Sequence, residues 1–113
     1  MVTVREQGQV VVLALSGRLM GGPDGTGFHQ LVDTLVAEGR TKILVNLDDV
    51  NWINSTGLGI LISAYTQVKK AGGHLRFCGV SERIQSILTI TKLSTVFETF
   101  QNEAAAVASY DRS

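Results

Sequence analysis

The sequence has one cysteine, one proline, few aromatic residues and no excess of charge of either sign. The single cysteine, Cys78, excludes an internal disulfide, and with only two histidines it leaves no metal-ligand spacing. Ten basic residues balance ten acidic ones, which removes the main electrostatic reason to expect a nucleic-acid partner. No apolar run is long enough to span a bilayer, and no segment resembles a signal peptide. We therefore expect a cytoplasmic protein without a metal, a cofactor or direct membrane insertion.

Hydrophobic periodicity divides the 113 residues into alternating strands and helices. The expected strands are Val2–Glu6, Gln9–Ser16, Lys42–Leu47, His74–Gly79 and Val96–Phe100. The expected helices are one from Thr26 that Gly39 ends, Gly57–Ala71, a short helix capped by Ser81, and Asn102–Tyr110. Strands that alternate with helices usually form parallel sheets joined by right-handed crossovers. We therefore predict an α/β fold, a small sandwich with a mixed, mostly parallel sheet, an N-terminal hairpin and about four helices.

The run Asn54–Gly59, with the sequence Asn-Ser-Thr-Gly-Leu-Gly, lies where a predicted strand passes into a predicted helix. In an α/β sheet this junction is at the carboxyl end of the strands, where ligands and partners usually bind. A helix start also leaves free N–H groups that favour an anion. A serine at this position can therefore accept a phosphate that the backbone tolerates. Leu58 has two interpretations, a core residue or a surface contact for a partner, and periodicity does not choose between them.

The chain carries no recognisable catalytic set. Residues 57–59 lack the serine between glycines that forms a hydrolase nucleophile elbow. A dinucleotide-binding turn would need a third glycine where Ile62 stands. Asp48 and Asp49 are adjacent and point to opposite faces of an extended chain, so a strand-end turn with solvated charges explains them better than a metal-binding pair. We therefore predict a protein that is not an enzyme and has no catalytic residue.

The remaining reactive side chains fit structural roles. Cys78 lies in an expected strand, where a buried, inert thiol is typical. His29 lies on the first predicted helix, away from its apolar stripe, as a solvated surface residue does. His74 follows two glycines and opens a strand as a turn residue. None of the three predicts a ligand.

The segment Leu44–Leu61 closely resembles the signature of STAS domains, the anti-sigma factor antagonists. The family pattern is an apolar strand, an acidic turn, and then Asp-Ser-Ser/Thr-Gly-Leu-Gly at the start of a helix. Ser16–Leu19 is similar to the family's strand-ending Gly-x-Leu, Lys69–Leu75 to its helix end and next strand, and Val96-Phe97 to the segment before its last helix. The resemblance covers nearly the whole chain and implies a single STAS-like domain over residues 1–113.

The resemblance implies a partner-switching regulator of transcription. In such families the unphosphorylated antagonist binds an anti-sigma factor that is also a serine kinase of the histidine-kinase-like ATPase type, and this binding releases the sigma factor. The kinase phosphorylates the serine before Ser/Thr-Gly, which is Ser55 here with Thr56 as second choice, and a serine phosphatase resets the switch. The implied partner-binding residues are Met20, Gly21, Asn54, Ser55, Thr56, Gly57 and Leu58.

Two residues depart from the family pattern. Asn54 stands in place of the acidic residue before the phosphoserine, and Met20 replaces the acidic residue that usually follows Gly-x-Leu. Both changes motivate an alternative, which is a STAS scaffold that is not phosphorylated or a transporter-associated interaction module. A third interpretation, from a different class, is a small-ligand or nucleotide-binding domain that uses the glycine-rich junction.

Overall fold

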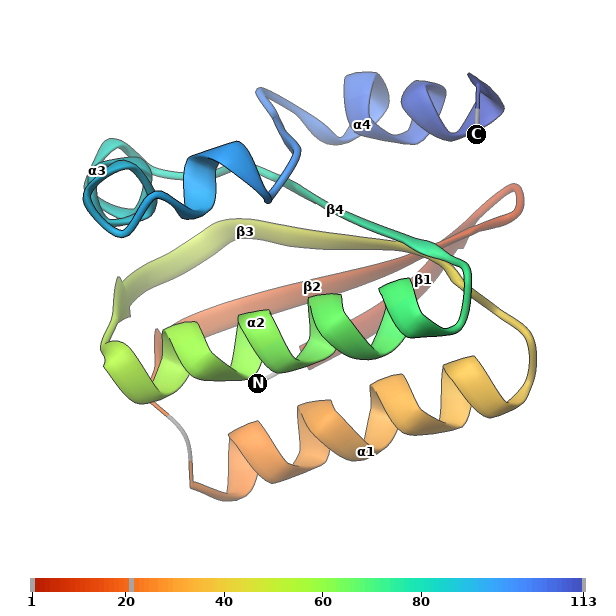
Figure 1. The fold of residues 1–113 in the computed structure, drawn as a ribbon, viewed down its shortest axis with the longest axis horizontal. Helices are drawn as coiled ribbons and strands as arrows, with labels where there is room; N and C mark the ends of the chain where they lie inside the picture. Colours follow the sequence, from red (N-terminus) through yellow and green to blue (C-terminus); the bar gives the residue numbers. More distant parts are fainter. Residues whose placement is uncertain (1, 21, 113) are drawn as a thin grey trace.

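The computed structural model describes residues 2–20 and 22–112, in which five strands and four α-helices follow one another in the expected order (Figure 1). The strands are β1 (Val2–Gln7), β2 (Val10–Leu19), β3 (Lys42–Ile53), β4 (His74–Cys78) and β5 (Thr99–Phe100). The helices are α1 (Pro23–Ala37), α2 (Ser55–Lys70), α3 (Glu82–Ile90) and α4 (Glu103–Ser109), with short 3₁₀ turns at Leu93–Thr95 and Tyr110–Arg112.

The five strands form one sheet in the order β1-β2-β3-β4-β5. β1 and β2 are antiparallel and are joined by a hairpin turn at Gly8-Gln9, whereas each later neighbour pairs in parallel. The predicted α/β class, with its N-terminal hairpin and mostly parallel sheet, is confirmed. The carboxyl ends of β2 and β3 lie together, since Leu19 pairs with Ile53 at the last position of both strands.

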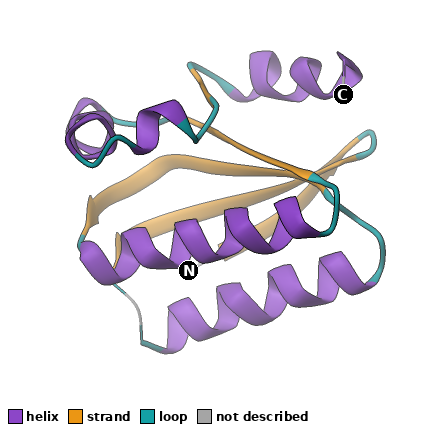
Figure 2. Ribbon diagram, in the orientation of Figure 1, coloured by secondary structure: helices purple, strands orange, loops and turns teal. Residues whose placement is uncertain are grey.

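Helices cover both faces of the sheet (Figure 2). On one face α1 and α2 lie side by side, and their apolar side chains pack with those of α3 and with Val11 and Leu13 of β2. On the opposite face α4 packs against Val10, Val12 and Leu44. Because successive strand residues point to opposite faces, the unbroken apolar run of β2 supplies both clusters.

Several element boundaries differ from those expected. β3 continues to Ile53, so Asp48 and Asp49 lie within a strand and not in a strand-end turn, although both stay exposed. The pairing of β2 with β3 shifts register at this point, between Ala14 and Ser16, which lets the strand pass the two acidic residues.

The other differences concern helix starts and the last strand. α1 begins at Pro23, whose fixed φ suits the first turn, and not at Thr26. α2 begins at Ser55, two residues before the expected start at Gly57. β5 comprises only Thr99 and Phe100, because the N–H groups of Val96 and Phe97 bond back to the Leu93 carbonyl in a turn.

Candidate functional site

The start of α2 is fixed by Asn54, the residue just before the helix. Its backbone is extended, and its side-chain Oδ1 accepts a hydrogen bond from the Gly57 N–H at 2.8 Å. Its carbonyl accepts from the Leu58 N–H at 2.9 Å, and its own N–H donates to the Leu19 carbonyl at 3.3 Å. Asn54 therefore caps α2 and ties it to the end of β2. Asparagine is among the strongest N-cap residues, and that signal alone places the helix start at Ser55.

Gly57 lies against the main chain of β2. A Cβ atom at this position would stand 1.9 Å from the Leu19 carbonyl oxygen and 2.6 Å from its carbon. No side chain fits in that space, so the glycine is required by the close approach of α2 to β2. Leu58 is only 8% exposed and belongs to the core, which decides between its two interpretations. Gly57 and Leu58 are therefore both buried, and they hold the first turn of α2 against β2 and the core.

Ser55 and Thr56 occupy the first two positions of α2 and are exposed. Among the described residues, neither hydroxyl has a hydrogen-bond partner, and the N–H groups of both residues are also free of one. Met20, one residue beyond the Leu19 carbonyl that binds Asn54, is 44% exposed. The structure thus brings Met20, Asn54, Ser55 and Thr56 to one end of the sheet, while the predicted partner residue Gly21 lies outside the described residues.

A groove between α1 and α2 adjoins this exposed helix start. Its volume is about 430 Å³, and it is lined by Gly22, Gly25, Thr26, His29, Thr56, Gly59, Ile60 and Ser63. Thr56 belongs to both the helix start and the groove. The sequence did not predict that α1 would line this groove. The glycines at the start of α1 and on the facing turn of α2 were a signal for a groove there, because a glycine has no side chain to fill the space between the helices. His29 is exposed as predicted, with its Nε2 3.4 Å from Asp33 Oδ2.

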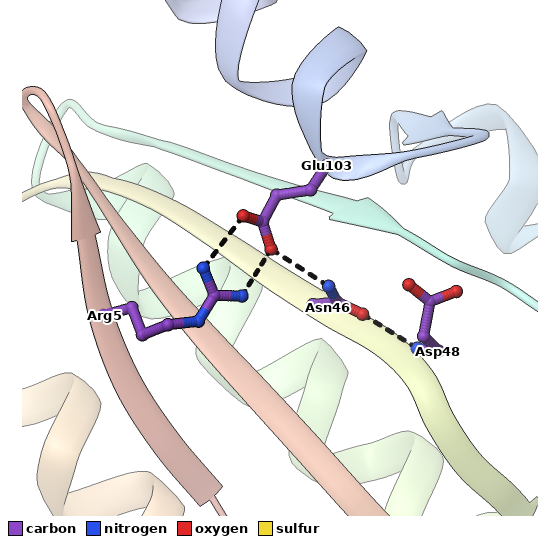
Figure 3. A network of polar contacts seen from close by, with 4 residues as sticks. All are labelled: Arg5, Asn46, Asp48 and Glu103. Carbon is purple, nitrogen blue, oxygen red and sulfur yellow. Dashed lines mark hydrogen bonds and ion pairs between the residues drawn. The ribbon is translucent and has the colours of Figure 1, made fainter.

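A polar network lies on the opposite face of the sheet (Figure 3). Both terminal nitrogens of Arg5 donate to the Glu103 carboxylate, at 2.9 and 2.6 Å, and Asn46 Nδ2 donates to the same group at 3.1 Å. The Asn46 side chain also accepts from the Asp48 N–H at 2.9 Å. The hydrogen bond from Arg5 lowers the pKa of the Glu103 carboxyl below its usual value. This network joins α4 to β1 and β3 and has a structural role.

Cys78 is fully buried, and burial raises the pKa of its thiol to about 11. The thiol is therefore neutral near pH 7 and unreactive, which agrees with the predicted inert role. In the described part of the chain, no three His, Cys, Asp or Glu side chains come together as a metal site. Within the same residues no helix is both long and apolar enough to span a bilayer.

An antiparallel hairpin leading into a parallel sheet, with an exposed serine at a glycine-rich helix start, defines a small α/β domain with an accessible strand-to-helix junction. Residues 1–106 match the family model of the STAS domain, and the chain belongs to that family. The resemblance of Leu44–Leu61 to the family signature is thereby confirmed.

Several relatives of the chain are named as antagonists. The anti-sigma-B factor antagonist of Bacillus subtilis is 35% identical over 63 residues, which is 56% of this chain and 58% of the relative. The chain thus spans less than two thirds of that relative's length. A candidate anti-sigma factor antagonist from Thermotoga maritima has a TM-score of 0.87 at 22% identity and covers 96% of this chain and 92% of its own.

A further similar solved structure is that of a phosphorylated protein. The phosphorylated form of SpoIIAA, a cell fate determinant from Bacillus, has a TM-score of 0.74 at 17% identity, with 93% of this chain and 96% of that chain covered. At such identities the structural likeness establishes the shared fold.

Proposed function

We propose that this protein is an anti-sigma factor antagonist in a partner-switching pathway that regulates transcription. Unphosphorylated, it binds an anti-sigma factor that is also a serine kinase of the histidine-kinase-like ATPase type. Phosphorylation of Ser55 releases that partner, and a serine phosphatase restores the first state. The proposal places the protein in the cytoplasm, where its partners act. Membership of the STAS family and relatives named as antagonists support it.

The exposed hydroxyl of Ser55 is the observation that carries the proposal. It stands at the first helical position, and the free N–H groups of Ser55 and Thr56 lie beside it. A phosphate on this oxygen would meet unpaired N–H donors and the positive end of the α2 dipole. We infer that the fold accepts the phosphate with little change in structure.

The phosphate on Ser55 then acts by weakening the binding of the partner protein. A phosphate brings about −1.5 to −2 charges and a tightly held hydration shell. A partner packed over Met20, Asn54, Ser55 and Thr56 would have to accommodate that group, and a penalty of ~3 kcal/mol weakens binding about a hundredfold. Asn54 keeps the helix cap through its neutral Oδ1, so phosphorylation meets no neighbouring carboxylate at that position.

The decisive experiment measures binding of the anti-sigma factor to the wild type and to Ser55→Asp. We expect the variant to bind at least tenfold more weakly with an unchanged far-UV spectrum. Ser86→Asp is the matched control, because it adds the same charge at an exposed position of α3. Incubation with the kinase and ATP should add one phosphate at Ser55, or at Thr56 as second choice. Equal binding by all three proteins, with a partner unrelated to kinases, would favour the scaffold alternative.

The groove between α1 and α2 supports a second candidate, which is binding of a small ligand such as a nucleotide. Its volume of about 430 Å³ lies within the range of small-molecule sites, and its glycines leave main-chain groups accessible. Calorimetry with a panel of nucleotides tests this candidate. The candidate is supported if the wild type releases or absorbs heat on binding a nucleotide and the Thr56→Val variant does not. It is refuted if the isolated wild-type protein binds none of the nucleotides.

A further inference from the structure

The sheet separates two hydrophobic cores of unequal size. The larger core lies on the face that α1 and α2 cover, and it also includes side chains of α3. The smaller core lies on the opposite face, under α4 (Figure 2), and among the described residues it includes no side chain of α1, α2 or α3. Its fully buried members are Val10, Val12, Leu44, Cys78, Ala106 and Tyr110.

The helix α4 contributes few side chains to this smaller core. Ala106 is fully buried and Val107 is partly buried, whereas Ala104 and Ala105 are exposed. Tyr110, in the turn that follows the helix, is 2% exposed. A helix of seven residues is too short to be stable in water by itself. The helical state of α4 therefore depends on a small set of contacts with the sheet.

The polar contacts of α4 also go to strands. Glu103 accepts from Arg5 and Asn46, and the side chains of Arg5 and Glu103 are partly exposed, so water and salt weaken their attraction (Figure 3). The hydroxyl of Tyr110 donates to the Ile43 carbonyl, and the guanidinium of Arg76 lies 4.6 Å from the centre of the Tyr110 ring. All of these contacts can break while the larger core stays packed.

We propose that α4 and the turn after it form a lid that opens from the sheet while the rest of the domain stays folded. Residues 101 and 102, an exposed bend before α4, are the hinge. Segments with few buried contacts open at a lower free energy than a large core unfolds. Opening uncovers the apolar side chains of Val10, Val12 and Leu44 and the thiol of Cys78. The lid does not depend on the Ser55 switch.

Cys78 reports the open state because it is the single cysteine and is fully buried when α4 is closed. Its thiolate attacks an aromatic disulfide reagent, so that a mixed disulfide forms and the other half of the reagent leaves as a coloured thiolate. The matched control carries Cys78→Ala and Val45→Cys. Val45 is also fully buried, but it belongs to the larger core on the other face of the sheet. The control thiol therefore reacts only when the whole domain unfolds.

The first measurement compares the two thiols at low reagent concentration, where the rate follows the equilibrium fraction of open protein. We expect Cys78 to react at least about tenfold faster than the control thiol. The increase of its logarithmic rate with urea should be less than about half that of the control, because the lid exposes less surface than global unfolding. Equal rates with equal dependence on urea would overturn the proposal.

Two mild substitutions provide the second measurement. Tyr110→Phe removes a hydrogen bond of the lid and should accelerate the reaction of Cys78 about fivefold. Ile84 lies in the larger core and is 1% exposed, so Ile84→Val destabilises the closed and open states equally and should leave the Cys78 rate unchanged. If Cys78 reacts only through global unfolding, Ile84→Val accelerates it about two- to tenfold. That acceleration, or an unchanged rate in Tyr110→Phe, would show that α4 is not an independent lid.

Discussion

Replacing Gly57 by alanine tests whether the approach of α2 to β2 fixes the candidate site. The new Cβ atom would stand 1.9 Å from the Leu19 carbonyl oxygen and 3.1 Å from Ile53 Cγ1. The first contact is with main chain, which moves only if the end of β2 or the start of α2 shifts. Such a shift would strain the hydrogen bonds of Asn54 to Leu19 and to Gly57.

The expected magnitude is the difference between two opposing effects. Overpacking against fixed atoms costs about 1–3 kcal/mol, and the clash with main chain belongs at the upper end of that range. The better helix propensity of alanine returns at most ~1 kcal/mol. We therefore expect Gly57→Ala to lower the free energy of unfolding by about 2 kcal/mol.

Gly59 provides the control within the same helix. A Cβ atom at Gly59 would meet no atom within 4 Å, so Gly59→Ala should stabilise the protein by about 0.5–1 kcal/mol. Thermal unfolding separates the two variants, since 1 kcal/mol corresponds to roughly 4 °C in a domain of this size. We expect Gly57→Ala to lower Tm by about 8 °C and Gly59→Ala to raise it by about 2–4 °C. A Gly57→Ala variant as stable as Gly59→Ala would refute the proposed packing.

Three further predictions concern the helix cap, the polar network and the C-terminal aromatic residue. Asn54→Ala should cost about 1 kcal/mol of unfolding free energy in urea titrations, and Asn54→Asp should restore it, because only alanine loses the cap. The pKa of Glu103 is lowered in the folded state, so its contribution to stability is complete above its unfolded pKa of about 4.3 and is lost as the pH falls through the lower folded value. Glu103→Gln should therefore lower the stability near pH 7 and weaken its decline in acid, and an unchanged acid limb in pH-dependent unfolding would contradict this. Tyr110→Phe removes the hydrogen bond to the Ile43 carbonyl and should cost about 1 kcal/mol, measured by thermal unfolding; no loss of stability would show that this bond contributes nothing.

Much of the fold was predictable because its signals are local. The unbroken apolar run at the start of β2 indicated an interior strand, and the stripe from Phe28 to Val36 indicated α1. α2 starts two residues before the predicted Gly57, because the Asn54 side chain caps the helix at that point. The extension of β3 beyond Asp48 was missed, since it depends on a register shift in the pairing with β2, which no local pattern encodes.

The sequence by itself determined the order of strands and helices, the family signature and the position of Ser55 at a strand-to-helix junction, because periodicity and short motifs depend on neighbouring residues. Only the tertiary structure decided that Leu58 lies in the core, that Gly57 is required by the Leu19 carbonyl, and that Thr56 borders a groove with α1. Each of these depends on atoms that are distant in the chain and meet only when the sheet and helices pack. Close packing therefore decides which residues of the run Asn54–Gly59 are exposed at the helix start and which hold the others in place.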